Sequence, residues 1–316
     1  MIVAGALRAI LVVRFRSWQS IPGQGVPMDT ELVARRFTAP FAADIPRDWL
    51  PSSPAIAAVL NTYTVLVPAN EAFYMRTLGA CLPRLTDPAL RAAAHAFIHQ
   101  EAEHGVAHKR FWRNLEQHGY RFRGFERAVD RLTFRMVEKI APLSLRVSMV
   151  SCVEHINAFI AHEFLTQDIL ADAHPEVRAM TEWHFAEEIE HKHVSYDVLQ
   201  AIAPGYGMRL LGLMLTAPLF YLLLTLGMLR FLTQDRQLFR LSTWGQLLRH
   251  FGHGHRMLPR TLGHLWAYAR PGFHPRQLDD AALAQAVIDR YGSGGCDWLA
   301  PANRGVAPTQ ARQLAA

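Results

Sequence analysis

Two short motifs carry residue types that bind metal ions. Glu101 and His104 are three residues apart, and Glu188 and His191 repeat that Glu-x-x-His spacing. In an α-helix this spacing places both side chains of a motif on one face. A buried carboxylate is costly unless a partner compensates its charge, and a bound metal ion would do so while using the imidazole. The two motifs therefore predict metal ligands.

Each motif follows a segment with one glutamate in an apolar stripe. Glu71 precedes Glu101 by 30 residues, and Glu154 precedes Glu188 by 34. The order Glu, Glu-x-x-His, given twice, is typical of ferritin-like dinuclear iron or manganese proteins. Four carboxylates balance two divalent ions, and mixed oxygen and imidazole ligation suits Fe(II) or Mn(II). We predict two metal ions, iron as Fe(II)/Fe(III), with manganese as the alternative.

One histidine makes the two halves unequal. His184 lies four residues before Glu188, where the first half carries Phe97. We interpret His184 as a seventh ligand. The alternatives are that it forms a hydrogen bond to a ligand or only packs in the core. The two metal positions should then be inequivalent. The predicted metal-binding set is Glu71, Glu101, His104, Glu154, His184, Glu188 and His191.

Three further residues lie one turn from predicted ligands. His108 is four residues after His104 and is expected to line the pocket or to hydrogen-bond to a ligand. Tyr74 and Asn157 each follow a predicted ligand by three residues and could line the pocket or hydrogen-bond to a ligand. For both, plain packing is the favoured interpretation.

The segments around these residues show helical periodicity, and no alternating strand pattern of any length occurs. Asp87 and Pro88 are typical of a helix start, and Gly119 of a helix end. Pro68 is expected to break or restart a helix, so that one helix runs from about 69 to 82. The sequence predicts an all-α, ferritin-like four-helix bundle with additional C-terminal helices.

Composition limits the class of protein. Half of the 316 residues are hydrophobic, which supports a large core and excludes wholesale disorder. The three cysteines, Cys81, Cys152 and Cys296, are widely spaced and suggest no disulfide framework, so a cytoplasmic location is expected. Basic residues are not interleaved with aromatic ones along a track, and nucleic acid is not expected as a partner. A homodimer is a further expectation.

The chain is expected to divide into four parts. Residues 1–40 form an N-terminal arm, with Met28 as an alternative native start, and residues 41–205 form the di-metal bundle. Residues 206–292 extend the same domain with an apolar helix and basic helices, and residues 293–316 form a flexible tail.

The residues from Leu210 to Leu229 form a run of twenty without a charge. That length suffices to cross a hydrocarbon core of about 30 Å. Residues 208–232 are therefore expected either to be buried on all sides or line an apolar pocket, or to associate with a membrane. Eight arginines against one acid, Asp235, lie between positions 230 and 276, and this excess would attract an anionic membrane surface.

These motifs resemble a known family. The resemblance covers roughly residues 40–280 and is carried by the runs 67–74, 96–104, 153–155, 183–192 and 273–275. Val67 and Asn70 replace that family's usual Phe and Gly, and neither is a predicted ligand. The chain is similar to the predicted metal-dependent hydrolase family. The run from His184 to His191 also resembles the three-histidine sites of p-aminobenzoate N-oxygenase and related di-iron oxygenases.

The predicted site is compatible with three functions. The preferred one is an O2-dependent oxidase or oxygenase, supplied by an electron donor, that acts on a small lipophilic or aromatic organic substrate. The first alternative is a metal-dependent hydrolase that uses a metal-activated water. The second alternative is non-catalytic, ferritin-like metal binding.

Overall fold

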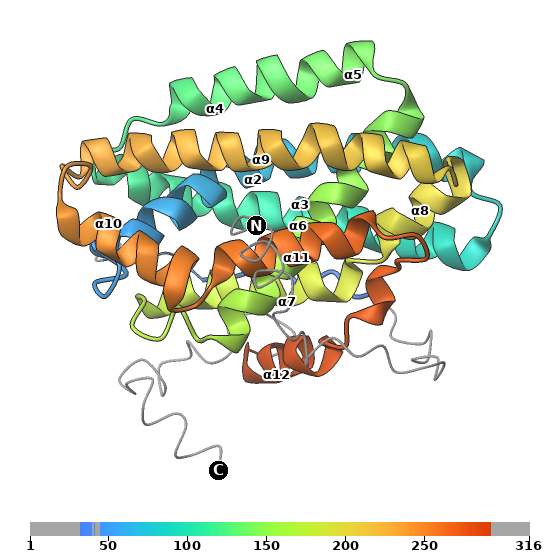
Figure 1. Cartoon of the computed structure of the whole chain (residues 1–316). Coiled ribbons are helices and arrows are strands. Elements are labelled where there is room, and N and C mark those ends of the chain that lie inside the picture. Colours follow the sequence, from blue (N-terminus) through green and yellow to red (C-terminus); the bar gives the residue numbers. More distant parts are fainter. Residues whose placement is uncertain (1–31, 40, 42–44, 292–316) are drawn as a thin grey trace, which may run out of the picture.

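The structure, a computed structural model, describes residues 32–39, 41 and 45–291. Within these residues it contains helices and irregular connections and no strand, so the predicted all-α class is confirmed (Figure 1). Met28, Cys296, and the arm and tail expected at the two ends fall wholly or largely outside the described residues. The division into four parts stays a prediction.

Four helices contain the predicted metal ligands: α2 (Pro54–Cys81), α3 (Pro88–Gln117), α6 (Leu143–Thr166) and α7 (Pro175–His191). Helix α2 contacts α3 and α6, and α7 contacts the same two helices, so the four close a ring around one core. This is the packing that a four-helix bundle requires. The more specific ferritin-like assignment stays an interpretation.

Local signals account for the ends of α3. The Asp87 side chain accepts a hydrogen bond from the Ala89 amide, and Pro88 occupies the first helical position. Gly119 follows the last turn with a φ of +78°, a conformation that favours glycine. The predicted start and end of this helix are confirmed.

The expected break at Pro68 was wrong. Helix α2 runs without interruption from Pro54 to Cys81, with Pro68 inside it. A proline leaves the carbonyl four residues earlier without its helical hydrogen bond. Here that carbonyl belongs to Thr64, and the indole Nε1 of Trp112 donates to it at 2.9 Å. Because α3 supplies the missing donor, the helix continues.

The remaining helices surround the four. They are α4 (Arg123–Val129), the π-helix η2 (Asp130–Arg135), α5 (Met136–Ile140), α8 (Val194–Ile202), α9 (Tyr206–Gln234), α10 (Leu241–Leu247), the π-helix η3 (Leu248–His253), α11 (Met257–Ala269) and α12 (Ala281–Tyr291). Two 3-10 turns are η1 (Leu82–Arg84) and η4 (Pro275–Gln277).

Helix α9 contains the apolar run and lies lengthwise against α2 and α6 (Figure 1). Two glycines allow the close approach. A Cβ at Gly212 would lie 2.1 Å from the Ser148 hydroxyl, and a Cβ at Gly227 would lie 2.1 Å from a Thr62 methyl group. Only 33% of the most apolar window of α9 is buried, so the helix is not buried on all sides.

Helix α11 is fastened to α6 by two buried histidines. His155 Nε2 donates to the His264 carbonyl at 3.1 Å, and His264 Nε2 donates to the His155 carbonyl at 3.0 Å. The two rings stack with centroids 3.8 Å apart and an interplanar angle of 3°. This reciprocal arrangement fixes α11, and with it the C-terminal helices, on the bundle.

Candidate metal centre

The structure brings the seven predicted ligand residues into the core. All seven residues are at most 2% exposed. They come from α2 (Glu71), α3 (Glu101, His104), α6 (Glu154) and α7 (His184, Glu188, His191). The spacing within each helix sets the face, and the ring of four helices turns these faces toward one another.

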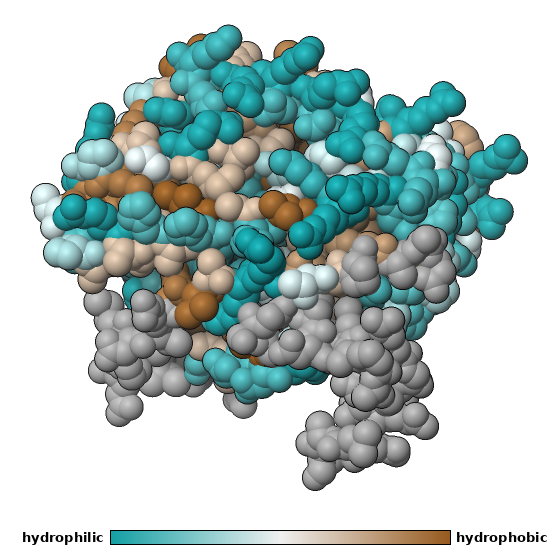
Figure 2. All heavy atoms as spheres, turned by 180° about the vertical axis from the view of Figure 1, so that it is seen from behind, coloured by the Kyte–Doolittle hydropathy of each residue, from teal (hydrophilic) through white to brown (hydrophobic). Residues whose placement is uncertain are grey.

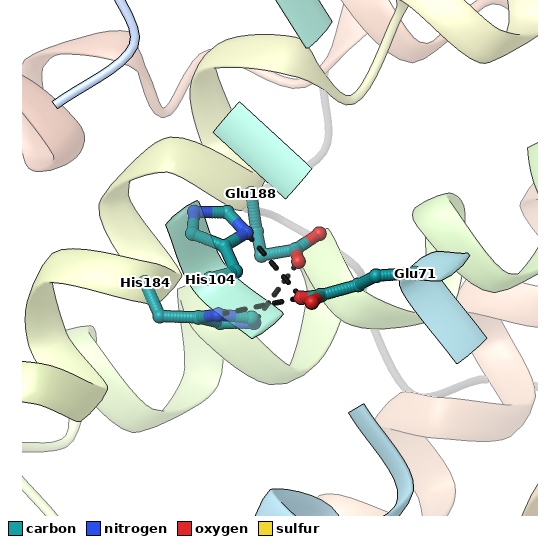
Figure 3. Close-up of side chains that lie close together, drawn as sticks. All are labelled: Glu71, His104, His184 and Glu188. Carbon is teal, nitrogen blue, oxygen red and sulfur yellow. Dashed lines mark ion pairs between the residues drawn. The ribbon is translucent and has the colours of Figure 1, made fainter. Parts of the chain in front are cut away.

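One group of potential ligands consists of Glu71, His104, His184 and Glu188. One ligand atom from each lies within 4.8 Å of the others. His104 Nδ1 is 3.4 Å from Glu71 Oε1, and His184 Nε2 is 3.0 Å from Glu188 Oε1. Figure 3 shows these side chains converging from three helices. His184, the residue that distinguishes the second half, belongs to this group.

A second group consists of Glu101, His104, Glu188 and His191, again with ligand atoms within 4.8 Å of one another. Because it shares His104 and Glu188 with the first group, the two positions are adjacent. Glu154 is in neither group, but its Oε2 lies 2.9 Å from His191 Nδ1. Each position thus has one histidine of its own, His184 in the first and His191 in the second, and Glu154 lies beside the second position.

The charges of these residues call for cations. None of the eight oxygens of the four carboxylates, Glu71, Glu101, Glu154 and Glu188, accepts a well-formed hydrogen bond within the described residues. Burial raises the pKa of all four carboxyl groups, in Glu188 to about 7. A buried acid without partners is unfavourable in its charged form, and a divalent ion removes that cost.

The imidazoles have the protonation state that metal ligation requires. Burial lowers the pKa of His104 and His191, and it lowers that of His184 to about 3. All three rings are therefore neutral near pH 7, and a neutral ring offers one nitrogen lone pair to an ion. Neutral imidazoles beside orphaned carboxylates fit two divalent cations.

One predicted ligand is oriented by residues that the sequence motifs did not reveal. His104 Nε2 lies 3.0 Å from Glu187 Oε2, and its Nδ1 faces the cluster. Arg35 donates to the other oxygen of Glu187 at 3.1 Å and to Glu190 at 2.6 Å. Burial raises the pKa of Glu187 to about 8, and Arg35 opposes that rise and favours the carboxylate. The only signal in the sequence was an acid next to Glu188.

A second chain of contacts leads away from His184. Its Nδ1 lies 3.2 Å from His108 Nε2, and His108 Nδ1 is hydrogen-bonded to the Thr64 hydroxyl at 2.9 Å. The Tyr63 hydroxyl is 3.0 Å from His184 Nε2. His108 thus lies where a residue supporting a ligand would lie. Thr64 is seven residues before Glu71, a spacing that places both on one face of α2.

Tyr74 and Asn157 are buried near the carboxylates. The Tyr74 hydroxyl has no hydrogen-bond partner within the described residues. Its pKa is raised by burial and then by the charges of Glu154 and Glu188, so it stays protonated. The Asn157 amide lowers the pKa of the same two carboxyl groups, against the effect of burial. Asn157 therefore favours the charged form of two predicted ligands, and Tyr74 lies within electrostatic reach of the same two.

One cavity is lined by the predicted ligand His184, and a second is lined by Tyr74. The smaller, of about 10 Å³, lies beside His184 and His108 and has room for about one water molecule. The larger, of about 40 Å³, lies between α2, η2, α6 and α9. Apolar side chains such as Phe73 and Phe220 line most of it, and its polar members are Asn70, Tyr74, Thr133 and Thr216. Tyr74 thus lies between this apolar space and the carboxylates.

Comparison with known proteins places the chain in a family. Residues 33–279 match the family model described as predicted metal-dependent hydrolase. The chain belongs to the predicted metal-dependent hydrolase family. The resemblance seen in the motifs is thereby confirmed, whereas no comparison supports the local resemblance to p-aminobenzoate N-oxygenase. Among curated proteins and solved structures, none matches.

Membership in the predicted metal-dependent hydrolase family adds evidence on function to the geometry of the site. The family's description agrees with a centre whose buried acids and neutral imidazoles need metal ions. It indicates an enzyme, and among the expected functions it favours the hydrolase over the oxidase.

Proposed function

We propose that the protein is a dinuclear metal-dependent hydrolase. The observation that carries this proposal is the pair of adjacent groups of buried ligand atoms that share Glu188 and His104. A pair of bound divalent ions lowers the pKa of a water molecule and polarises a carbonyl or phosphoryl oxygen. The family description supports the same reaction class.

The residues of the chain divide into two ligand sets. Glu71 and His184 would hold one ion, and Glu101 and His191, with Glu154 beside them, would hold the other. Glu188 and His104 belong to both groups and lie between the two positions. Each group contains two glutamates and two histidines, so His184 does not make the two positions unequal. The difference between them is Glu154, which lies beside the second set.

Tyr74 is the residue best placed to assist a reaction from the protein side. Its hydroxyl is buried, protonated and without a partner in the described chain, and it borders the larger cavity. Such a hydroxyl would donate a hydrogen bond to an oxygen that gains negative charge. The apolar cavity walls would bind the lipophilic part of a substrate and exclude water. We therefore propose an ester or phosphoester with an apolar group as the substrate class.

The test uses protein stripped of metal and reloaded separately with Fe(II), Mn(II) and Zn(II). Metal content and hydrolysis of p-nitrophenyl esters and phosphoesters with apolar groups of increasing size are measured. We expect two ions per chain and turnover with at least one metal. Absence of turnover with every metal and both ester classes would refute the hydrolase.

A matched pair of variants tests the role of Tyr74. Tyr74→Phe should lower kcat about a hundredfold, as expected for loss of a donor to a developing charge, without changing metal content. Tyr206→Phe is the control, because the Tyr206 hydroxyl donates to the Ala269 carbonyl at the protein surface. An unchanged kcat in Tyr74→Phe would remove Tyr74 from the reaction.

A second candidate is an O2-dependent oxidase acting with an electron donor. The small cavity beside His184 favours it, since that space suits a diatomic molecule better than an ester. Protein loaded anaerobically with Fe(II) would be exposed to O2 and followed by visible absorption and Mössbauer spectroscopy. Spectra that do not change on exposure would exclude this candidate and leave the hydrolase unaffected.

A further inference from the structure

Helix α9 has the length and composition of a membrane span but is held against the bundle. Within the described chain it is the helix long and apolar enough to cross a membrane. Yet Gly212 contacts Ser148 of α6, and Gly227 contacts Thr62 of α2. These glycines are fifteen positions apart, or about 22 Å along the axis. The apolar run is therefore fastened along its whole length and leaves one side uncovered.

The uncovered side continues onto a neighbouring helix. Leu211, Leu215 and Leu222 of α9 are 44%, 47% and 53% exposed, and Leu258, Leu262 and Trp266 of α11 are 55%, 60% and 71% exposed. The α11 residues recur every four positions, which places them on one face. The Tyr206 hydroxyl of α9 donates to the Ala269 carbonyl of α11 at 2.6 Å, so the two helices are joined. We call these six residues the docking face.

Helices α9, α10 and α11 lie on the near side in Figure 1. Figure 2 shows the molecule from behind, where hydrophilic residues cover much of the visible surface and hydrophobic residues form a band and smaller patches among them. The six residues of the docking face are all at least 44% exposed, and a large exposed apolar area of this kind marks an interaction site.

The segment that contains the α11 part of the docking face is rich in exposed arginines. All eight arginines between positions 230 and 276 are exposed, against the single acid Asp235. Arg47 and Tyr120 already bind the Asp235 carboxylate. Arg260 pairs with Glu163 and Arg276 with Asp197. Most of the positive charge in this segment is therefore not neutralised by its own acids.

Four of the eight arginines lie where the helices of this side join. Arg236 and Arg240 are in the connection from α9 to α10, and Arg249 and Arg256 are in and after η3. None of the four makes an ion pair within the described residues. A cationic rim beside exposed leucines and a tryptophan is complementary to anionic lipid headgroups above acyl chains.

We propose that the docking face binds the surface of an anionic phospholipid membrane, with α9 and α11 parallel to the membrane plane. The leucines and Trp266 enter the headgroup and upper acyl region, and the arginines contact lipid phosphates. An anionic membrane is complementary in charge to the arginines. A second copy of the chain is not, because its own arginines would face those of the first copy. The inference is independent of the reaction at the metal centre.

The experiment is vesicle cosedimentation of the full chain. Vesicles of phosphatidylcholine alone are compared with vesicles that also contain phosphatidylserine, at low and high salt. We expect binding to the anionic vesicles that weakens with salt, because the Debye length shrinks. Arg236→Glu/Arg240→Glu should lower the partition coefficient at least about tenfold. Leu262→Ser/Trp266→Ser should lower it through loss of apolar insertion.

The controls lie on α3. Arg91→Glu/Arg113→Glu changes the same charge at exposed positions of that helix, and Val106→Ser removes an apolar side chain that is 45% exposed there. These variants should bind like the unaltered chain. Binding that falls equally in control and test variants would overturn the proposal, as would no binding to anionic vesicles at low salt.

The proposal can also be tested on the unaltered chain, without variants. Hydrogen–deuterium exchange with and without anionic vesicles should show protection of residues 206–269, whereas the exposed part of α3 should not change. Sedimentation velocity without lipid tests whether a second copy of the chain binds the docking face instead. A dimer that Trp266→Ser dissociates, together with no vesicle binding, would overturn the proposal and assign the face to self-association.

Discussion

His104 Nε2 lies 3.0 Å from Oε2 of Glu187, while Nδ1 of the same ring faces Glu71 and Glu101. The carboxylate accepts a hydrogen bond from the Nε2–H group, which leaves the lone pair of Nδ1 directed at the cluster. Arg35 binds the second oxygen of Glu187 at 3.1 Å and holds the acceptor in place. A partner of this kind fixes the tautomer and the orientation of a ligating histidine.

Removal of that partner should weaken metal binding without removing a ligand. We expect Glu187→Ala to bind metal about 10- to 100-fold more weakly than the unaltered chain, measured by competition with a chelator of known affinity. Glu103→Ala is the control, because Glu103 pairs with Arg36 away from the cluster. Equal affinities in Glu187→Ala and the control would show that His104 needs no such partner.

Glu188 should matter to both ions, because it is in both groups of ligand atoms. Glu188→Ala is therefore expected to lower metal content from two ions per chain to one or none, measured by elemental analysis after gel filtration. Glu71→Ala should leave at least one ion, because Glu71 belongs to one group. Two ions retained in Glu188→Ala would contradict the assignment of the centre.

The ligand positions were predictable because they depend on local geometry. The Glu-x-x-His spacing sets a face within one helix, and the duplicated order places one glutamate on each preceding helix. The partner of His104 was not predictable in this way. Arg35 and Glu187 are 152 positions apart, and nothing in the periodicity of either segment indicates their contact. Such long-range contacts depend on how the segments pack.

The break expected at Pro68 shows how tertiary contacts override a local rule. The rule concerns the carbonyl of Thr64, which loses its helical donor. Trp112, on the neighbouring helix, replaces that donor. Because α2 continues through Pro68, Tyr63 and Thr64 belong to the same helix as Glu71, and they contact His184 and His108.

The histidine pair between α6 and α11 predicts acid sensitivity. Burial lowers the pKa of His155 to about 3 and that of His264 well below 6.5. In the unfolded chain both have a pKa of about 6.5, so below that pH the unfolded state binds protons that the folded state excludes. The contribution of these two histidines to the free energy of unfolding is therefore complete above about pH 6.5 and is lost as the pH drops toward 3. Each histidine contributes up to about 1.4 kcal/mol per pH unit.

Denaturant unfolding between pH 8 and pH 4 tests this prediction. The double variant His155→Gln/His264→Gln should be less stable at neutral pH, because the reciprocal hydrogen bonds are disturbed, and its stability should depend less steeply on pH. His99→Gln, at an exposed position of α3, should keep the slope of the unaltered chain. An unchanged slope in the double variant would mean that other groups set the acid sensitivity.

The close approach of α9 to α6 predicts opposite effects for two glycine-to-alanine changes. A Cβ at position 212 would lie 2.9 Å from the backbone carbonyl carbon of Ser148, an atom that moves only if the helices separate. Gly212→Ala should therefore lower the free energy of unfolding by about 1–3 kcal/mol, as overpacking does. Gly79→Ala, in α2, has nothing within 4 Å of the new methyl group. It should raise stability by about 0.5–1 kcal/mol through the helical preference of alanine. Denaturant unfolding measures both, and a Gly212→Ala chain as stable as Gly79→Ala would show that α9 is not packed tightly on α6.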